Sequence, residues 1–157
     1  MKSPINNEVR ENIITNRKAF HDYHIEEKFI AGIVLTGTEV KSLHEKKVNF
    51  LDAYCYLSEG NEVLLKNMHV NIYSHGTYNN HEPNRVRKLL MQKKEIRKIR
   101  RQLEEKGFTL IPLQLFFNMK NLVKITIGLA KGKKLYDKRE DSKEKDAKRE
   151  IERRDKY

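Results

Sequence analysis

The chain has 157 residues, and 33 Lys and Arg outnumber 22 Asp and Glu, so its net charge is +11 at pH 7. This length predicts one domain with tails, and the charge predicts an anionic partner such as nucleic acid, a phosphoinositide surface or an acidic protein. No apolar run approaches the length of a membrane span, and we expect no signal peptide. Cys55 is the only cysteine, which excludes an intrachain disulfide and favours a cytoplasmic location.

The first part of the chain predicts an arm, a short helix, a strand and a second helix. Residues 1–15 are polar and mixed, so we expect a flexible N-terminal arm. Asn16 is a suitable N-cap for a helix over residues 17–22. Loose alternation of apolar side chains predicts a strand over residues 23–35. A stripe of apolar side chains then predicts a helix over residues 36–44.

The middle of the chain predicts a β-hairpin followed by a polar loop. Residues 53–57 and 62–70 are strand-like and flank a Ser-Glu-Gly-Asn turn. The loop over residues 73–84 contains Gly, Asn and Pro, and residues 85–91 are expected to begin in an extended conformation. Aromatic and amide side chains in this loop suit contact with unstacked RNA bases.

The last part of the body predicts a helix and a second hairpin. Apolar side chains recur on one face over residues 92–105, and a glycine follows. Residues 108–118 and 122–131 read as two strands around a tight turn. Short antiparallel strands on a basic chain predict a mainly β fold with flanking helices. We expect an OB-like closed antiparallel β-barrel over residues 16–130, with two to three α-helices.

Residues 85–101 form the most basic part of the body. They contain nine Lys or Arg residues and a single acid, Glu95. On a helix with one buried face, these cations project outward and can neutralise phosphates. The alternative is a charged helix face that serves only solubility.

The tail, residues 131–157, contains 12 Lys or Arg against 8 Asp or Glu, a net charge of +4. Its few apolar side chains cannot offset the entropy of folding, so we expect it to be disordered when free. Opposite charges at helical spacing, such as Glu150 and Arg154, favour a helix once a partner surface is present. A solvated charged tail is the alternative.

The sequence contains no pattern typical of catalysis or of metal binding. Its six histidines do not have the spacing of a zinc site. Glu26 and Glu27 are adjacent, so on a strand they would point to opposite faces and could not share a proton. Cys55 lies within a predicted strand and is interpreted as a small buried apolar residue. We therefore expect no metal, no cofactor and no enzymatic activity.

Four sequence blocks follow one another in a specific order. They are Asn-Arg-Lys-Ala at 16–19, Gly-Thr-Glu-Val-Lys-Ser-Leu at 37–43, Asn-His-Glu-Pro at 80–83 with Arg-Lys-Leu-Leu at 87–90, and Leu-Ala-Lys-Gly-Lys-Lys-Leu-Tyr-Asp-Lys-Arg-Glu at 129–140. Together they resemble the SmpB family, the SsrA-binding (tmRNA-binding) proteins of bacteria. The resemblance covers the chain from about residue 16 to residue 140.

The resemblance implies an RNA-binding factor for trans-translation. Such a protein binds the tRNA-like domain of tmRNA (SsrA RNA) and delivers it to stalled ribosomes. Its tail occupies the decoding centre and the empty mRNA channel, so that the nascent peptide is tagged and the ribosome is rescued. The implied partners are tmRNA, the small ribosomal subunit with its rRNA and, through the tmRNA complex, elongation factor Tu and alanyl-tRNA synthetase. We expect a cytoplasmic monomer without membrane contact.

The resemblance also implies two sets of site residues. The tmRNA-binding set is Asn16, Arg17, Lys18, Glu39, Lys41, His81, Arg85, Arg87, Lys88 and Leu90. The ribosome-binding set is Gly132, Lys133, Lys134, Tyr136, Asp137, Lys138 and Arg139. If Arg87 contacts a phosphate, Arg87→Ala should weaken tmRNA binding and reduce its salt slope by about one.

Four positions depart from the family pattern. Ile30 stands where Glu is common and His44 where Arg is usual, which removes a hydrogen-bond acceptor and a phosphate-binding group. Lys46 and Asn121 stand where glycines are expected in turns. A general RNA chaperone using the same barrel is the alternative function, and an RNA-processing nuclease is a third. Selectivity for the tRNA-like fold distinguishes the first two, and RNA cleavage with Mg²⁺ would indicate the third.

Overall fold

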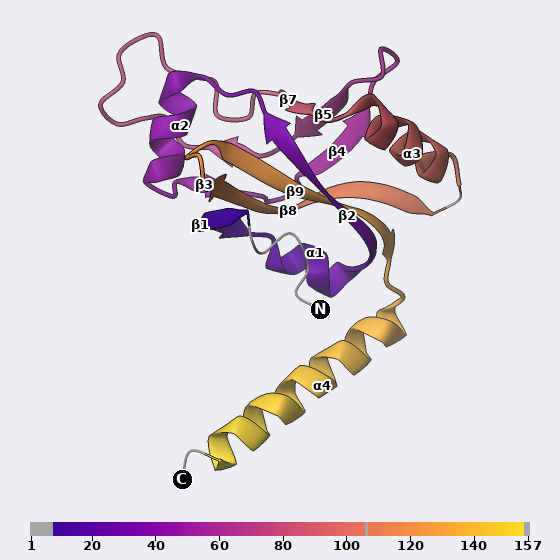
Figure 1. The fold of residues 1–157 in the computed structure, drawn as a ribbon. Coiled ribbons are helices and arrows are strands. Elements are labelled where there is room, and N and C mark those ends of the chain that lie inside the picture. The colour runs from indigo at the N-terminus through magenta and orange to yellow at the C-terminus, as the bar shows by residue number, and fades with distance from the viewer. Residues whose placement is uncertain (1–7, 106, 156–157) are drawn as a thin grey trace.

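The computed structural model describes residues 8–105 and 107–155, and within these ranges it contains four helices and nine strands (Figure 1). The mainly β fold is confirmed: three helices flank the strands, within the two to three expected, and the fourth lies in the tail. The helices are α1 (Arg17–Asp22), α2 (Gly37–His44), α3 (Lys93–Glu104) and α4 (Leu135–Arg154). The strands are β1 (Val9–Thr15), β2 (Tyr23–Ile33), β3 (Val48–Asn49), β4 (Tyr54–Leu57), β5 (Val63–Lys66), β6 (His69–Val70), β7 (Arg87–Leu90), β8 (Phe108–Asn118) and β9 (Val123–Gly132).

Seven of these strands make one sheet whose ends meet. Its order is β1-β8-β4-β5-β7-β2-β9, and β9 also pairs with β8, so that six strands form a ring with β1 outside it. All pairings in this sheet are antiparallel, as the predicted hairpins require. β3 and β6 form a separate two-stranded sheet.

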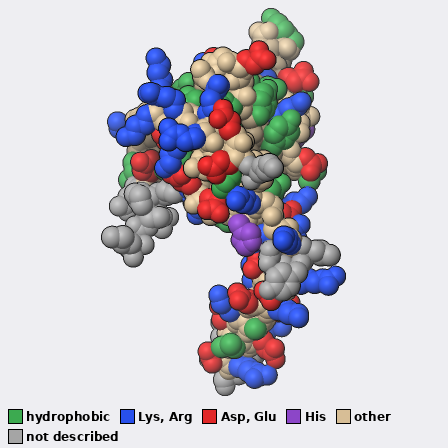
Figure 2. All heavy atoms as spheres, turned by 90° about the vertical axis from the view of Figure 1, so that its right-hand side faces the viewer, with side chains coloured by type: hydrophobic (Ala, Val, Ile, Leu, Met, Phe, Trp, Pro, Cys, Tyr) green, Lys and Arg blue, Asp and Glu red, His purple; other side chains and the backbone are tan. Residues whose placement is uncertain are grey.

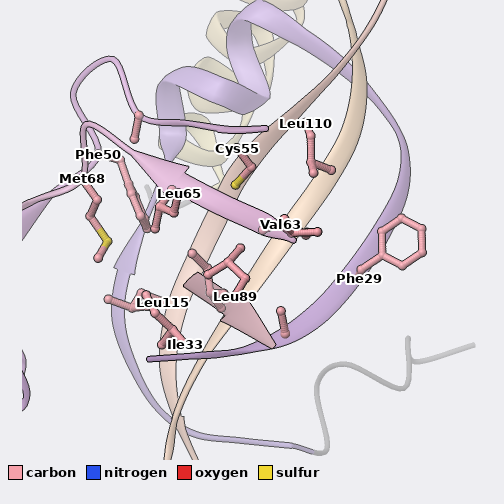
Figure 3. Close-up of a cluster of buried hydrophobic side chains, with 14 of the residues drawn as sticks. Phe29, Ile33, Phe50, Cys55, Val63, Leu65, Met68, Leu89, Leu110 and Leu115 are labelled. Carbon is pink, nitrogen blue, oxygen red and sulfur yellow. The ribbon is translucent and has the colours of Figure 1, made fainter. Parts of the chain in front are cut away.

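The core is a continuous cluster of apolar side chains from the strands of the ring and from α2 and α3. Figure 3 shows part of it, including Val63 and Leu65 of β5, Leu89 of β7 and Leu115 of β8. These four side chains are at most 2% exposed. Removing such apolar surface from water stabilises a fold by about 25 cal/mol per Å², so this cluster is the main source of stability.

The starts of the first two helices follow from local side chains. The Asn16 carboxamide oxygen accepts a hydrogen bond from the Ala19 N–H at 3.2 Å, which confirms the predicted cap of α1. Thr36 and Glu39 form a reciprocal capping box at the start of α2, in which the Thr36 N–H donates to Glu39 Oε1 at 2.9 Å.

The flexible arm expected over residues 1–15 is wrong for residues 9–15. These residues form β1, in which Ile14 pairs with Leu115 of β8, and Ile13 is buried. This segment adds a strand beside β8. Its mixed composition gives no clear alternating pattern, so the sequence alone did not predict the pairing. Residues 1–7 lie outside the described residues.

The tail begins later than the expected boundary and is helical. β9 continues to Gly132, two residues beyond the predicted end of the body at residue 130. α4 then extends away from the body (Figures 1 and 2). Glu150 and Arg154 form the expected ion pair at 3.0 Å. A helix was expected here only beside a partner surface. None of the described helices is long and apolar enough to cross a membrane.

Candidate nucleic-acid interface

A buried polar network joins α2 to β7. Glu39 and Arg87 are both fully buried, and Arg87 Nε donates a hydrogen bond to Glu39 Oε2. Arg85 Nη2 donates to the other carboxylate oxygen, Oε1, at 2.5 Å. Arg87 Nη1 donates to the Met68 carbonyl at 2.7 Å and Nη2 to the Pro83 carbonyl at 3.1 Å. The buried charges are therefore paired and hydrogen-bonded, which is what burial of an ion requires.

This network shifts the pKa of its carboxyl group. Burial would raise the pKa of Glu39, but the hydrogen bonds from the Thr36 N–H, Arg85 and Arg87 together outweigh burial and lower it. Burial is also the main cause that lowers the pKa of Arg87, and Glu39 opposes this effect. The pair is thus ionised at neutral pH and stabilises the junction of α2 and β7.

Glu39 and Arg87 were predicted to bind tmRNA, and their burial corrects that prediction. Both side chains are 0% exposed, so neither can touch RNA on this surface. The hydrogen bonds of Arg87 to carbonyls of the chain also leave it no role as a phosphate contact. These two residues instead position Arg85, whose side chain is 34% exposed.

His81 is a second predicted contact that the fold buries. Its Nδ1 lies 2.9 Å from Thr38 Oγ1, and its Nε2 lies 3.0 Å from the Val70 carbonyl oxygen. The imidazole is 7% exposed and joins the start of α2 to the end of β6. His81 therefore fixes one side of the loop over residues 71–86 and does not present its ring to a ligand.

The loop over residues 71–86 carries exposed side chains on this support. Asn80 Nδ2 donates to the Tyr73 carbonyl at 2.8 Å, which closes the loop on itself. Lys41 of α2 lies over the Tyr73 ring, with its Nζ 5.3 Å from the ring centroid. Tyr78 is 95% exposed. An exposed phenol such as that of Tyr78 suits stacking with an unpaired base.

Along β7, buried and exposed side chains alternate. Arg87 and Leu89 point inward and are buried, while Lys88 and Leu90 point outward. Lys88 Nζ donates to the exposed carboxylate of Glu62 at 2.9 Å, and Leu90 is 53% exposed. Lys88 and Leu90 are therefore the members of the predicted set on β7 that a ligand can reach.

The other members of the predicted tmRNA set lie on α1. Arg17 and Lys18 are exposed. Asn16 caps this helix and its Nδ2 donates to the Pro112 carbonyl at 2.8 Å, so it is a positioning residue. In Figure 1, α1 lies at the bottom of the body and β7 at the top. The structure therefore does not bring the predicted tmRNA set into one cluster.

The predicted ribosome-binding set begins where the tail meets α1. The Lys133 N–H donates to the Asp22 carbonyl at 2.8 Å, and the Lys133 ammonium pairs with Asp141. Lys138 Nζ lies 3.4 Å from Asp22 Oδ1. Asp22 was absent from the predicted sets, although it lies only three residues after the block at residues 16–19.

The remaining members of this set differ in what the structure says of them. Gly132 pairs with Tyr23 at the end of β9, and Lys134 and Arg139 are exposed. The side chains of Tyr136 and Asp137 lie outside the described residues.

The four departures from the family pattern have local explanations. Ile30 pairs with Thr126 and leaves no carboxylate at this point of β2. His44 stacks on Phe117 with ring centroids 4.4 Å apart, so it packs against the body. Lys46 and Asn121 have φ of 57° and 62°, the left-handed conformation that favours glycine. The two expected turns are therefore present without glycine.

The histidines, the cysteine and the acidic residues are the candidates for metal ligands and nucleophiles. Within residues 8–105 and 107–155, no group of three or more His, Cys, Asp or Glu is arranged to hold a metal ion. Cys55 is buried as predicted, and burial raises the pKa of its thiol well above the ordinary value.

The mainly β fold, the exposed Lys and Arg on its helices and the projecting charged helix are the features expected of a nucleic-acid-binding protein. A family model described as "SmpB protein" matches residues 13–157. The SsrA-binding protein of Geobacter sulfurreducens is 54% identical over 139 residues, 88% of this chain and 90% of the relative. That of Phocaeicola vulgatus is 51% identical over 140 residues, 89% of this chain and 93% of the relative.

A solved structure agrees with these relatives. One chain of the structure described as "tmRNA-SmpB: a journey to the center of the bacterial ribosome" matches with a TM-score of 0.66 and 45% identity. The match covers 78% of this chain and 85% of that chain. The protein therefore belongs to the SmpB family, the SsrA-binding proteins.

Proposed function

We propose that this protein binds the tRNA-like domain of tmRNA and delivers it to stalled ribosomes in trans-translation. The family membership and the likeness to a tmRNA–SmpB structure support this role. The proposed partners are tmRNA and the small ribosomal subunit, with elongation factor Tu and alanyl-tRNA synthetase acting on the same complex. The role is binding without catalysis, and its proposed place is the cytoplasm, where bacterial ribosomes work.

The observation that carries the proposal is the projection of α4 from the body. The body and α4 meet near α1, and among the described residues those beyond Ser142 are exposed, up to Asp155 (Figure 1). A charged helix clear of the body can enter a channel lined by RNA while the body stays on another ligand. We therefore propose that the body holds tmRNA and that α4 occupies the decoding centre and the empty mRNA channel.

The accessible part of the predicted tmRNA set supports the role of the body. It comprises Arg17, Lys18, Lys41, Arg85, Lys88 and Leu90. The ring of six strands supports a closed, OB-like barrel, the architecture in which strands and loops bind RNA. We also propose that the part of α4 beyond Ser142, which has few apolar side chains and is exposed, is disordered in the free protein and becomes ordered on the ribosome.

Competition binding tests the division between body and tail. A tRNA-like tmRNA fragment is labelled and unlabelled unstructured RNA of equal length is the competitor. The full chain is compared with a chain ending at Lys134, because a cut at Ala130 would remove paired residues of β9. Selective binding by both chains is the expected result. Loss of selectivity in the shortened chain would assign the tail to the tmRNA site, and absence of selectivity in both would favour a general RNA chaperone.

A tail variant tests the second half of the proposal. Asp137→Ala, Lys138→Ala and Arg139→Ala are combined in one chain. We expect tmRNA binding to be unchanged and peptide tagging on stalled ribosomes to be lost, because these residues belong to the proposed ribosome-binding set. Loss of tmRNA binding in this variant would contradict the division of labour.

A further inference from the structure

The outward face of α3 is a strongly basic surface that neither set of predicted site residues includes. Figure 2 shows Lys and Arg side chains crowded on the part of the molecule that α3 occupies. The exposed cations of this helix, which we call the α3 basic face, are Lys93, Lys94, Arg97, Lys98 and Arg101. Glu95 lies between these cations in the sequence, and its carboxylate accepts a hydrogen bond from the Gln92 N–H at 3.3 Å in a capping box. This carboxylate therefore serves the start of the helix.

A groove runs between α3 and β7, beside this face. Its volume is about 690 Å³, within the roughly 300–1,000 Å³ of small-molecule sites. Leu89, Leu90, Met91 and Ile96 supply apolar surface. The cations along the groove are Lys88, Lys93, Arg97 and Arg100, against the single carboxylate of Glu62.

Two details show how much of this charge is available. Lys88 pairs with Glu62 at 2.9 Å and Lys98 pairs with Glu27 at 2.5 Å, so both are partly neutralised. Arg100 also lines the groove, but its Nε is buried, so we do not count this atom among the donors that a ligand can reach. Lys93 and Arg97 are exposed and line the groove.

We propose that the groove between α3 and β7 takes one unstacked nucleotide of tmRNA, and that the α3 basic face binds the phosphates on either side of it. An apolar wall with cations at its rim matches a nucleotide, because the base has an apolar face and the backbone is anionic. The inference rests on the proposed function and adds an element, α3, to the surface that tmRNA covers.

The position of the groove favours tmRNA over ribosomal RNA. Lys88 and Leu90 of β7 line it and are accessible members of the predicted tmRNA set. An RNA segment that contacts β7 can therefore also contact α3, because residues of both elements line the same groove. α4, which is proposed to meet the ribosome, lies below the body in Figure 1, whereas α3 lies at its upper right.

The salt dependence of binding tests the phosphate contacts. The variant carries Lys93→Gln with Arg97→Gln, and the matched control carries Lys66→Gln with Lys120→Gln. All four positions are exposed, and each double variant removes two charges. The slope of log K against log salt for the tRNA-like fragment should become shallower by about 1.4–1.8 in the α3 variant, and less in the control. Equal slopes in the two variants would overturn the proposal.

Ribosome binding distinguishes the two sources of RNA. If the α3 variant binds the tmRNA fragment like the wild-type chain but associates less with ribosomes, the face serves ribosomal RNA and the inference is wrong. If the wild-type chain itself fails to prefer the tRNA-like fragment, the proposed function fails. If the wild-type chain is selective and the variant keeps its slope, only the inference fails.

A methyl signal tests the base in the groove. The Ile96 methyl groups are observed by NMR in the full chain while the tRNA-like fragment is added. A base stacked against this wall should shift them through its ring current, whereas the Ile13 methyl groups, buried at β1, should move less. Unshifted Ile96 signals at saturating fragment would overturn the nucleotide site, even if the salt slope changes.

Discussion

At the scale of single residues, Glu39 belongs to the motif at residues 37–43 but has a structural role, because its side chain is buried. Its two carboxylate oxygens accept from Arg87 and Arg85 in a place that water does not reach. Removing one partner of a buried ion pair leaves the other charge without compensation. The network therefore affects RNA binding only by fixing Arg85 and the loop over residues 71–86.

We expect Glu39→Ala to destabilise the protein by about 3–5 kcal/mol, because it leaves the buried guanidinium of Arg87 unpaired. Urea unfolding followed by circular dichroism measures this change. Glu62→Gln, which breaks the exposed pair with Lys88, is the control and should cost about 0–1 kcal/mol. A loss below that of the control would show that the buried pair adds no stability.

The lowered pKa of Glu39 also predicts a pH dependence. The unfolded chain takes up this proton near the ordinary value of 4.5, and the folded chain does so at a lower pH. The contribution of Glu39 is thus present above pH 4.5 and is lost as pH falls through the folded pKa. Between about pH 5 and pH 3, the free energy of unfolding should fall more steeply for the wild-type chain than for Glu39→Gln. Parallel curves would contradict the shift.

Burial decides which residue predictions the sequence can support. Glu39, His81 and Arg87 belong to the motifs that resemble the family, but a motif does not show whether a side chain faces water or the core. The period-two pattern of β7 was the available signal, because Lys88 and Leu90 alternate with buried Arg87 and Leu89. The expected loss of a phosphate contact in Arg87→Ala is replaced by an expected loss of stability.

At the scale of elements, the pairing of β9 with two neighbours depends on a small residue. Gly128 pairs with Ile111 of β8 and with Lys28 of β2. A Cβ at this position would lie 2.8 Å from Leu113 Cδ1 and 3.2 Å from Ile25 Cγ2. Leu113 is buried, so it has little room to move.

We expect Gly128→Ala to destabilise the protein by about 1–3 kcal/mol through overpacking. Thermal and urea unfolding measure the effect. Gly37→Ala is the matched control, because nothing lies within 4 Å of the Cβ it would add at the start of α2. If the two variants unfold alike, the close approach at Gly128 is relieved at no cost.

Local signals predicted most elements and failed where pairing is remote. Asn16 marks the start of α1, and the spacing of apolar residues marks α2, α3 and the last hairpin. β1 and β3 were missed, and β6 was predicted only as the end of one strand over residues 62–70, because each is stabilised by a partner distant in sequence and has little pattern of its own. The ring that joins β8 to β9 and β4 also depends on remote pairing.

At the scale of the whole molecule, the direction of α4 is set by a small contact with α1. The Asp22 carbonyl accepts a hydrogen bond from the Lys133 N–H, and the Asp22 carboxylate forms an ion pair with Lys138. Ser142 Oγ lies 3.5 Å from His21 Nε2, which extends the contact by one further turn. The hydrogen bond with His21 is the main cause that lowers the pKa of Asp22. Burial acts in the opposite direction, and Lys138 lowers this pKa further. These charges are near solvent, so salt weakens the contact.

We expect Asp22→Asn to loosen the base of α4 without unfolding the body. The variant keeps the carbonyl that receives the Lys133 N–H but loses the charge that faces Lys138. Amide hydrogen exchange should become faster over residues 138–142 and stay unchanged in β8 and β9. The control is Glu26→Gln, a substitution at an exposed position of β2, which should leave exchange in both regions unchanged. If the contact directs α4 into the mRNA channel, tagging on stalled ribosomes should fall while tmRNA binding is kept. Exchange and tagging equal to those of the Glu26→Gln chain would show that α1 does not set the direction of the tail.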